Sequence, residues 1–300
     1  MPELPEVEVV RFGLEPAVEG AVVSRVQIFD DRSLRRHDGP AEDFVERLTG
    51  AGLLTPERRG KFLWIPVAGR DEAVVVHLGM SGQVLLREPG AELDRLTRIV
   101  IDVDNPRHGP VRVDFVDQRI FGSMALDHLV AAADQPSHRI PSHVAHIARD
   151  PVDPLFDDEK FLRALARKDT TIKRALLDQT LVSGIGNIYA DEALWAARVH
   201  YDQPTRSLSR ARAVTLLAEV RLVLGKALAE GGTSFDYQYV NVNGGSGYFS
   251  QSLNAYGQTG LPCPRCGRPI VRESFMNRGS HFCAHCQRIR LGRSAAGPTP

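Results

Sequence analysis

The four cysteines constrain the fold of this chain most strongly. They lie near the C-terminus as Cys263-x2-Cys266 and Cys283-x2-Cys286, with 16 residues between the two pairs. Two residues between thiolates allow both sulfurs to reach one tetrahedral ion from a single tight turn. Two such pairs predict a zinc ribbon with one structural zinc ion, because four thiolates leave no position for water. A pair of disulfides or a redox CxxC motif is the alternative.

The distribution of charge indicates a nucleic-acid partner, although the formal net charge is zero. Residues 263–300 contain seven arginines, no lysine and one acid, so this segment carries +6 and the rest of the chain −6. A strongly basic block on a neutral protein is typical of phosphate binding. A solvated basic tail would give the same composition.

Nothing in the sequence indicates a membrane partner or export. No apolar run approaches the roughly 18 residues that a spanning helix needs. The start, MPELPEVEVVR, lacks the charged and apolar regions of a signal peptide. We therefore expect a cytoplasmic protein, and 300 residues are enough for two buried cores.

The pattern along the chain changes from strands to helices. Residues 2–14 combine early prolines and acids with spaced apolar positions, which predicts a helix. Short β-branched runs then predict a β-sandwich or barrel, at residues 21–28, 62–67, 73–78, 98–103 and 111–115. Residues 158–230 have helical periodicity. We expect the last of these helices to begin at Ser209, to bury Val214, Leu217, Val220, Leu224 and Leu228, and to stop at Gly231-Gly232.

Two segments could carry chemistry. Removal of Met1 would leave Pro2 as the first residue, and a free α-amine titrates at about 7.7–8.0, so much of it is neutral at working pH. A secondary amine can attack a sugar C1′ and form an iminium, and Glu3 could move the proton. In the second segment, Gly184-Ile185-Gly186 precedes Asn187 at a helix start, where N–H groups can grip phosphate. The alternative for the first segment is that Met-Pro-Glu is a common N-terminal sequence without a catalytic role. The alternative for the second is a plain helix-turn-helix without a phosphate contact.

Four motifs occur together and in order: MPELPEVE, VSGIGNIYADEAL, GYFSQSLNAYG and C-x2-C-x16-C-x2-C followed by Gln287-Arg288. In this combination, which spans residues 1–290, the chain resembles the formamidopyrimidine-DNA glycosylases, the bacterial oxidised-purine glycosylases. The resemblance implies a multidomain α+β fold with an N-terminal helix and β-sandwich, a helix–two-turn–helix domain and a C-terminal zinc ribbon.

The pattern along the chain predicts where these parts begin and end. The expected segments are a catalytic β-sandwich domain at 1–135, a linker at 136–156, the helical domain at 157–250, the zinc finger at 254–290 and a disordered tail at 291–300. A mobile lid over the damaged base would lie within about residues 233–247 of the helical domain.

The family's catalytic residues map onto matching positions. Pro2 is then the nucleophile and Glu3 its acid–base partner. Lys61, in Arg59-Gly60-Lys61-Phe62-Leu63, would assist β-elimination. Arg278, in Asn277-Arg278-Gly279, would bind the phosphate beside the lesion and assist the second elimination.

The family's DNA-contacting residues map in the same way. Met80, Arg119 and Phe121 would fill the gap that the extruded nucleotide leaves in the duplex, and Asn187 would contact a phosphate. We also expect Lys168 and Lys173 to contact phosphates, because they are positively charged groups of the helical domain. Burial in the β-sandwich is the alternative for Met80 and Phe121, although a Gly-Met-Ser-Gly turn is a poor place for a core residue. An ordinary surface or strand position is the alternative for Lys61 and His77, and for His77 we favour it. Leu96 and Ile120 depart from the family pattern, which leaves their DNA contacts open.

The implied activity is that of a bifunctional DNA glycosylase and AP lyase. Its partner would be double-stranded DNA with oxidised bases or abasic sites, its cofactor one structural zinc ion, and its state a monomer. An endonuclease VIII-type enzyme with the same architecture and a preference for oxidised pyrimidines is one rival. A non-catalytic DNA-binding protein is another, and the presence together of Pro2, Glu3 and Lys61 argues against it.

Overall fold

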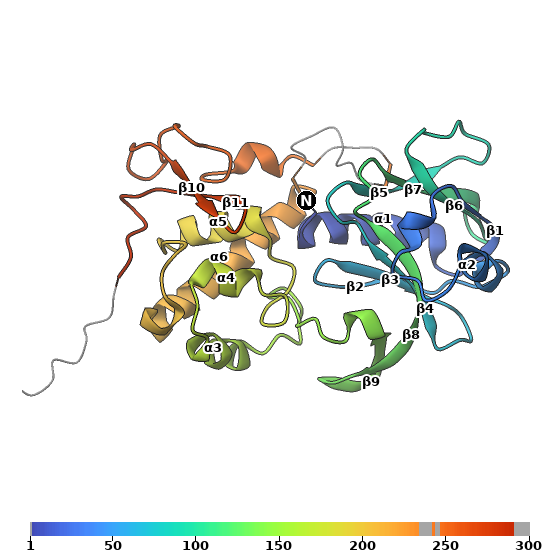
Figure 1. Ribbon diagram of the computed structural model, residues 1–300, viewed down its shortest axis with the longest axis horizontal. Coiled ribbons are helices and arrows are strands. Elements are labelled where there is room, and N and C mark those ends of the chain that lie inside the picture. Colours follow the sequence, from blue (N-terminus) through green and yellow to red (C-terminus); the bar gives the residue numbers. More distant parts are fainter. Residues whose placement is uncertain (1, 234–241, 244–246, 291–300) are drawn as a thin grey trace, which may run out of the picture. The chain divides into compact units, whose positions relative to one another are not determined.

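The computed structural model describes residues 2–233, 242–243 and 247–290 (Figure 1). It divides into two compact units, one formed by the residues up to 147 with residues 227–250, the other by residues 148–226 with those after 250. Met1 and the expected tail at 291–300 lie outside the described residues. The described helices of unit 1 are α1 (Leu4–Val18), α2 (Ala41–Leu48) and the 3-10 turns η1 (Asp31–Leu34) and η2 (Ser142–Val144).

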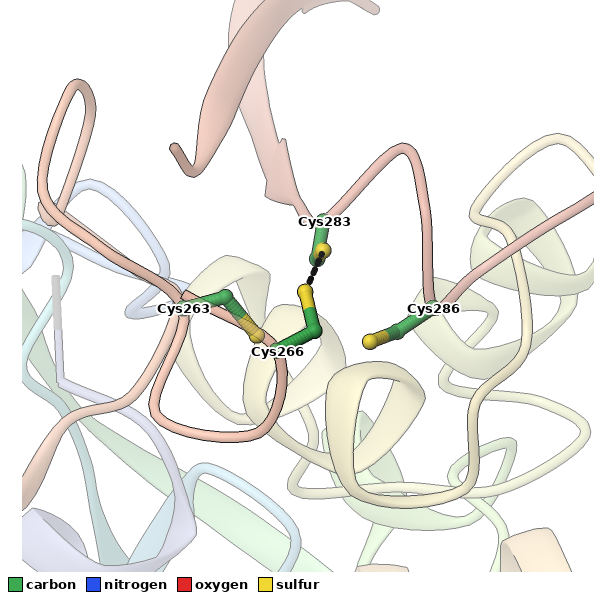
Figure 2. Close-up of side chains that lie close together, drawn as sticks. All are labelled: Cys263, Cys266, Cys283 and Cys286. Atoms are coloured by element: carbon green, nitrogen blue, oxygen red, sulfur yellow. Dashed lines mark hydrogen bonds between the residues drawn. The ribbon is translucent and has the colours of Figure 1, made fainter. Parts of the chain in front are cut away.

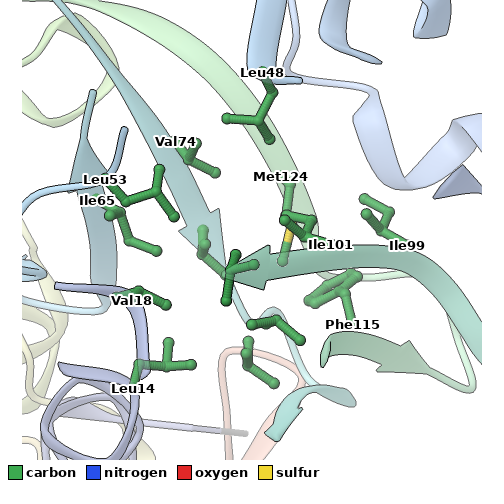
Figure 3. Packing of buried hydrophobic residues seen from close by; sticks show 14 of the residues in the cluster. Leu14, Val18, Leu48, Leu53, Ile65, Val74, Ile99, Ile101, Phe115 and Met124 are labelled. Carbon is green, nitrogen blue, oxygen red and sulfur yellow. The ribbon is translucent and has the colours of Figure 1, made fainter. Parts of the chain in front are cut away.

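Unit 1 is an antiparallel β-sandwich, as the sequence predicts. Its four-stranded sheet has the order β1-β6-β7-β5, with bounds Val22–Ile28, Thr97–Asn105, Gly109–Asp117 and Gly82–Arg87. Its five-stranded sheet has the order β2-β3-β4-β8-β9, with bounds Glu57–Arg59, Phe62–Pro66, Glu72–His77, Ser123–Ala132 and Gln135–Pro141. One apolar core joins α1 and both sheets (Figure 3); Leu14, Ile65, Val74 and Phe115 are among its members.

The opposite face of the five-stranded sheet extends unit 1 beyond the expected boundary. Trp64 and Val75, which alternate with core-facing neighbours on β3 and β4, pack with Ile140 and Val144. The expected linker at 136–156 is therefore wrong over its first half, because residues 136–147 supply β9, η2 and the cover of this apolar face. Polar and proline-rich composition hid a strand that pairs along β8.

Residues 227–250 also belong with unit 1 rather than with the helical domain. Val242 is buried against α1, where a Cβ atom added to Gly13 would overlap its Cγ2. The Leu86 N–H donates to the Val242 carbonyl at 2.7 Å. Of the expected lid at 233–247, residues 234–241 and 244–246 lie outside the described part of the chain.

Unit 2 combines helices with a small hairpin. Its elements are α3 (Asp158–Arg167), α4 (Ile172–Leu177), α5 (Asn187–Ala196), most of α6 (Arg210–Ala229), the 3-10 turns η3 (Thr205–Ser207) and η4 (Phe249–Ser252, which begins in unit 1), and strands β10 (Val271–Phe275) and β11 (Arg278–Phe282). Helix α6 follows Ser209 and stops at two left-handed glycines, Gly231 and Gly232, as expected. The expected burial of Val214 is wrong, since 46% of it is exposed and Ala213 faces inward instead.

A buried carboxylate ties α5 to the segment before the zinc ribbon. Glu192 accepts N–H bonds from Asn254, Ala255 and Tyr256, at 3.0, 2.8 and 2.8 Å. Burial raises the pKa of Glu192, against the effect of these backbone donors. The NAYG motif thus owes its place in the chain to a turn that wraps one side chain of α5.

Candidate active site and nucleic-acid interface

The first turn of α1 places Pro2 and Glu3 at a buried helix start. Glu3 occupies the N-cap, and Glu6 accepts its backbone N–H at 2.8 Å, as in a capping box. The other oxygen of Glu6 accepts the Thr233 N–H at 2.7 Å and the Thr233 hydroxyl at 2.8 Å. One carboxylate therefore joins the predicted nucleophile's neighbour to the turn that follows α6.

Sequence reasoning missed Glu6, although its signal was available. An acid three residues after the N-cap is the capping-box spacing, and here that acid serves a second segment more than 200 residues away. Gly232 is needed beside it, because a Cβ atom there would lie 3.0 Å from Oε1 of Glu6 and its φ is +83°.

Lys61 lies half-buried in the turn between β2 and β3. Helix α1 holds β2 through ions: Arg58 Nε lies 2.7 Å from Glu8 Oε2, and Arg11 contacts the same carboxylate at 2.8 Å. These pairs join the strand before Lys61 to the helix that Pro2 precedes. Pro2 and Glu3 thus lie at the start of α1, and Lys61 follows the strand that α1 holds.

His77, at the end of β4, lies among cations. Burial first, and then Arg36, Lys61 and Arg35, lower the pKa of His77 to about 3. Its ring packs on Phe62, with centroids 4.8 Å apart, and its Nδ1 accepts the Gly79 N–H at 3.1 Å. His77 is therefore a neutral acceptor at physiological pH, and our interpretation of it as a strand residue agrees with this position.

The three predicted gap-filling side chains project from two loops of unit 1. Met80 stands between β4 and β5 and is 40% exposed; Phe121 stands between β7 and β8 and is 43% exposed, and Arg119 is exposed beside it. The two loops touch, because a Cβ atom on Gly79 would overlap the Phe121 carbonyl oxygen. Burial in the core, the alternative for Met80 and Phe121, is excluded.

The predicted phosphate contacts of unit 2, besides Arg278, are Asn187, Lys168 and Lys173. Asn187 begins α5, and its side-chain amide donates to the Gly279 carbonyl at 3.0 Å. Lys168 is half-exposed and pairs with Asp178 at 2.6 Å. Each thus already has a partner in the protein, and Asn187 is buried as well.

Lys173 does not fit the prediction of a phosphate contact. Its side chain is fully buried, and its Nζ lies 2.6 Å from Asp191 Oδ1 and 2.7 Å from Ser280 Oγ. Asp191 also accepts the His281 N–H at 2.8 Å. Lys173 therefore fixes β11 against α4 and α5, a role that its sequence neighbourhood does not indicate.

Arg278 stands at the tip of the β10–β11 hairpin and is exposed. The turn itself is Met276-Asn277, both in the left-handed region with φ of 48° and 60°. Such a two-residue turn matches the twist of a hairpin. Arg278 therefore directly follows the turn and begins the returning strand.

The four cysteines come together at the base of this hairpin (Figure 2). Their sulfurs all lie within 4.8 Å of one another, and the Cys266 and Cys283 sulfurs are 3.5 Å apart. Sulfurs bound tetrahedrally to zinc at about 2.3 Å would have about this spacing. None of the four is in a disulfide, so the set fits a structural zinc ion.

Comparisons with known proteins agree with this arrangement. The formamidopyrimidine-DNA glycosylase N-terminal domain matches residues 1–124, the H2TH domain of these enzymes residues 147–238, and a zinc finger found in FPG and IleRS residues 260–289. A formamidopyrimidine-DNA glycosylase of Leifsonia xyli is 62% identical over 297 residues, which cover 96% of this chain and all of the relative.

The chain belongs to the formamidopyrimidine-DNA glycosylase family.

Solved structures extend the match to the fold. Fpg of Lactococcus lactis, in a complex with DNA containing an abasic site, is 30% identical, with a TM-score of 0.81 and coverage of 95% of this chain and 99% of that one. MutM (FPG) protein of Thermus thermophilus is 34% identical, with a TM-score of 0.79 and coverage of 95% and 98%. Among the residues that the structure describes, no helix has the length and apolar character to cross a bilayer.

Proposed function

We propose that this member of the formamidopyrimidine-DNA glycosylase family excises oxidised purines, 8-oxoguanine and formamidopyrimidines, from double-stranded DNA and then cuts the strand as an AP lyase in base excision repair. The observation that carries the proposal is the buried Pro2-Glu3 pair at the capped start of α1, joined through Glu6 to Thr233. The names of the relatives support the glycosylase activity.

In the proposed reaction Pro2, freed by removal of Met1, acts through its secondary amine. The nitrogen attacks C1′, and the bond from C1′ to the base breaks, so that the base leaves with that electron pair. Glu3 gives a proton to the sugar ring oxygen as the ring opens, and the amine loses its own proton to form the iminium. No redox cofactor takes part in these steps.

Strand cleavage follows from the iminium. It acidifies the C2′ hydrogen, and loss of that proton expels the 3′ phosphate by β-elimination, with Lys61 assisting. Loss of the C4′ proton then expels the 5′ phosphate by δ-elimination, with Arg278 assisting, and water releases Pro2. The product is a one-nucleotide gap.

The remaining residues serve binding. Met80, Arg119 and Phe121 occupy the gap in the duplex, which offsets the few kcal/mol that unstacking costs. Lys168, Asn187 and Arg278 contact phosphates. One zinc ion on the four cysteines would supply structural stability alone, holding the hairpin that carries Arg278. We propose a monomer that works on DNA in the bacterial cytoplasm.

Two rival functions make different predictions. The first rival is an endonuclease VIII-type preference for oxidised pyrimidines. An oxidised pyrimidine by itself does not distinguish the two enzymes, since a wild-type Lactococcus lactis Fpg has been solved in complex with DNA that contains one. The names of the sequence relatives favour the purine substrate. A non-catalytic DNA-binding protein would need neither Pro2 nor Glu3.

Borohydride trapping tests the proposal on duplexes with 8-oxoguanine, an oxidised pyrimidine or an abasic site. We expect a trapped adduct on 8-oxoguanine and on the abasic site, and a much weaker 8-oxoguanine adduct in Pro2→Gly, where a primary amine replaces the secondary amine. Pro5→Ala, in the same turn but away from the amine, is the matched control and should still trap. Trapping on the pyrimidine alone would assign the rival specificity. DNA binding without trapping on any of the three duplexes would overturn the proposed enzymatic activity.

A further inference from the structure

The two loops that carry the predicted gap-filling side chains are joined into one support. We call residues 79–82 the Met80 loop and residues 117–122 the Phe121 loop. We propose that Arg35 is the positioning residue of this support: it fixes the backbone of the Phe121 loop so that Met80, Arg119 and Phe121 are presented together to the duplex. This inference rests on the proposed function, which supplies the role of the three side chains.

Arg35 binds the Phe121 loop by its carbonyl oxygens. Its Nη1 donates to Ile120 at 3.0 Å and to Gly122 at 2.6 Å, and its Nη2 donates to Phe121. Three successive carbonyls thus share one guanidinium. A planar fork of five N–H donors can do this, whereas the three donors of an ammonium group diverge from one point.

The base from which Arg35 acts is itself anchored. Arg35 directly follows η1, whose Ser33 and Leu34 are buried, and Leu34 belongs to the main apolar core of unit 1. Asp30 caps η1 by accepting the Arg32 N–H at 3.1 Å. The guanidinium therefore fixes the Phe121 loop relative to the apolar core of unit 1, although the two bonded residues are 85 positions apart in the chain.

Asp117 holds the same loop by its N–H groups. This fully buried carboxylate accepts the Gly122 N–H at 2.7 Å, the Arg119 N–H at 3.1 Å and the Ser81 hydroxyl at 2.5 Å. The last bond reaches into the Met80 loop. Together with the close approach of Gly79 to the Phe121 carbonyl, which leaves no room for a Cβ atom, it locks the two loops to each other.

The conformation that is held in this way is unfavourable by itself. Ile120 has a φ of 55°, a region that β-branched residues rarely adopt. Strain of this kind persists only where the surroundings determine the backbone, and it occurs preferentially at functional sites. Arg35 donates to the carbonyl oxygens of Ile120, Phe121 and Gly122. These are the groups that would have to move if Ile120 relaxed to a more favourable φ.

Such a support matters because a gap-filling side chain must resist the stacked bases. A loose loop would let Phe121 withdraw, and extrusion of the base would lose its compensating contact. Where no stacked duplex exists, the support has nothing to resist. Loss of Arg35 should therefore impair action on a lesion in duplex DNA and spare the chemistry at Pro2.

The experiment uses the full-length protein with Arg35→Gln and Arg35→Lys, and Arg32→Gln, in the 3-10 turn just before Arg35, as the matched control. We expect Arg35→Gln to lower kcat/KM on duplex 8-oxoguanine by about 10- to 100-fold, as loss of charged hydrogen bonds would. Arg35→Lys should recover little, and Arg32→Gln should stay within about twofold of the wild type. Borohydride trapping on a single-stranded abasic oligonucleotide should be unchanged in all three.

A second readout needs no catalysis. A duplex with a tetrahydrofuran site beside 2-aminopurine reports unstacking on binding by its rise in fluorescence. We expect that rise to be lost in Arg35→Gln and kept in Arg32→Gln. If the fluorescence rises equally in Arg35→Gln and Arg32→Gln, Arg35 does not position the gap-filling side chains and the proposal is overturned. A wild type that unstacks this duplex but traps on no DNA would overturn the proposed function while leaving the support in place.

Discussion

Among the turns that carry an exposed arginine, one in each unit shows how differently such a turn can be stabilised. The Phe121 loop of unit 1 and the Met276-Asn277 turn of unit 2 both contain non-glycine residues with positive φ. The first is held by hydrogen bonds that Arg35 donates and Asp117 accepts, next to the large core of the sandwich. The second is held by Lys173, Asp191 and the cysteine cluster.

The difference follows from the size of the apolar core available to each turn. Unit 1 buries a contiguous core from both sheets and α1, so hydrogen bonds alone can fix one of its loops. One buried cluster of the zinc module contains Cys263, Ile270 and Cys283, and Phe275 and Phe282 of the hairpin pack on Tyr201. These clusters are smaller than the sandwich core, so we expect a metal ion and a buried ion pair to add to the stability of the hairpin.

Removal of zinc should have the largest effect on stability, and it should destabilise the hairpin of unit 2 but not the sandwich of unit 1. A Cys283→Ser/Cys286→Ser variant, or chelation, forfeits a binding free energy of about 10–16 kcal/mol. We expect amides of β10 and β11 to lose protection in hydrogen exchange while those of β3 and β4 keep theirs. Equal protection of the hairpin with and without metal would show that packing alone holds it.

Breaking the buried pair should have the next largest effect. Lys173→Met leaves the Asp191 carboxylate buried without its cation, and we expect a loss of about 3–5 kcal/mol in the free energy of unfolding of unit 2. Urea unfolding followed by hydrogen exchange in α5 measures it. Lys168→Met, which breaks the more exposed pair with Asp178, is the matched control and should cost about 0–1 kcal/mol. Lys173→Met/Asp191→Leu should recover most of the loss.

Acid should weaken unit 1 through His77. Its pKa in the folded state is lowered to about 3 from the usual 6.5 by burial and by Arg36, Lys61 and Arg35, so the unfolded chain binds its proton first. This contribution to stability is complete above pH 6.5 and is lost as the pH falls toward 3, by at most about 1.4 kcal/mol per pH unit. In His77→Phe that part of the slope should vanish, whereas exposed His108→Phe should keep the slope of the wild type.

Substitution of Arg278 should have the smallest effect. Arg278→Gln removes one proposed phosphate contact without disturbing the turn, so DNA affinity should fall on every sequence alike. The slope of log K against log salt should decrease by about 0.9, as measured by fluorescence anisotropy at several salt concentrations. Arg268→Gln, at the first cysteine knuckle, should leave the slope unchanged. A change in slope for both variants would mean that the basic segment acts as a whole.

Much of the fold and of the candidate site could be predicted from the sequence because the signals are local. The paired cysteines specify a shared metal site by their spacing, and Pro2, Glu3 and Pro5 specify a helix start. Alternating apolar residues predicted β3 and β4, and Ser209 with Gly231-Gly232 bounded α6. Each of these depends on residues within a few positions of one another.

The errors lie where distant segments decide. Lys173 looks like a surface cation in its helix, and only the packing of β11 on α5 buries it beside Asp191. Residues 136–147 and 242 look like linker and lid until β8 and α1 supply their partners.

The sequence by itself determined the metal-ligand set, the sandwich, the helices and the candidate nucleophile. Only the tertiary structure decided which charged groups are buried, that Glu6 serves two segments, and that Arg35 and Asp117 support the Phe121 loop. The physical reason is that propensity and spacing act over one or two turns of chain. Burial of a charge or a hydrogen bond to a backbone carbonyl depends on which distant segment arrives beside it.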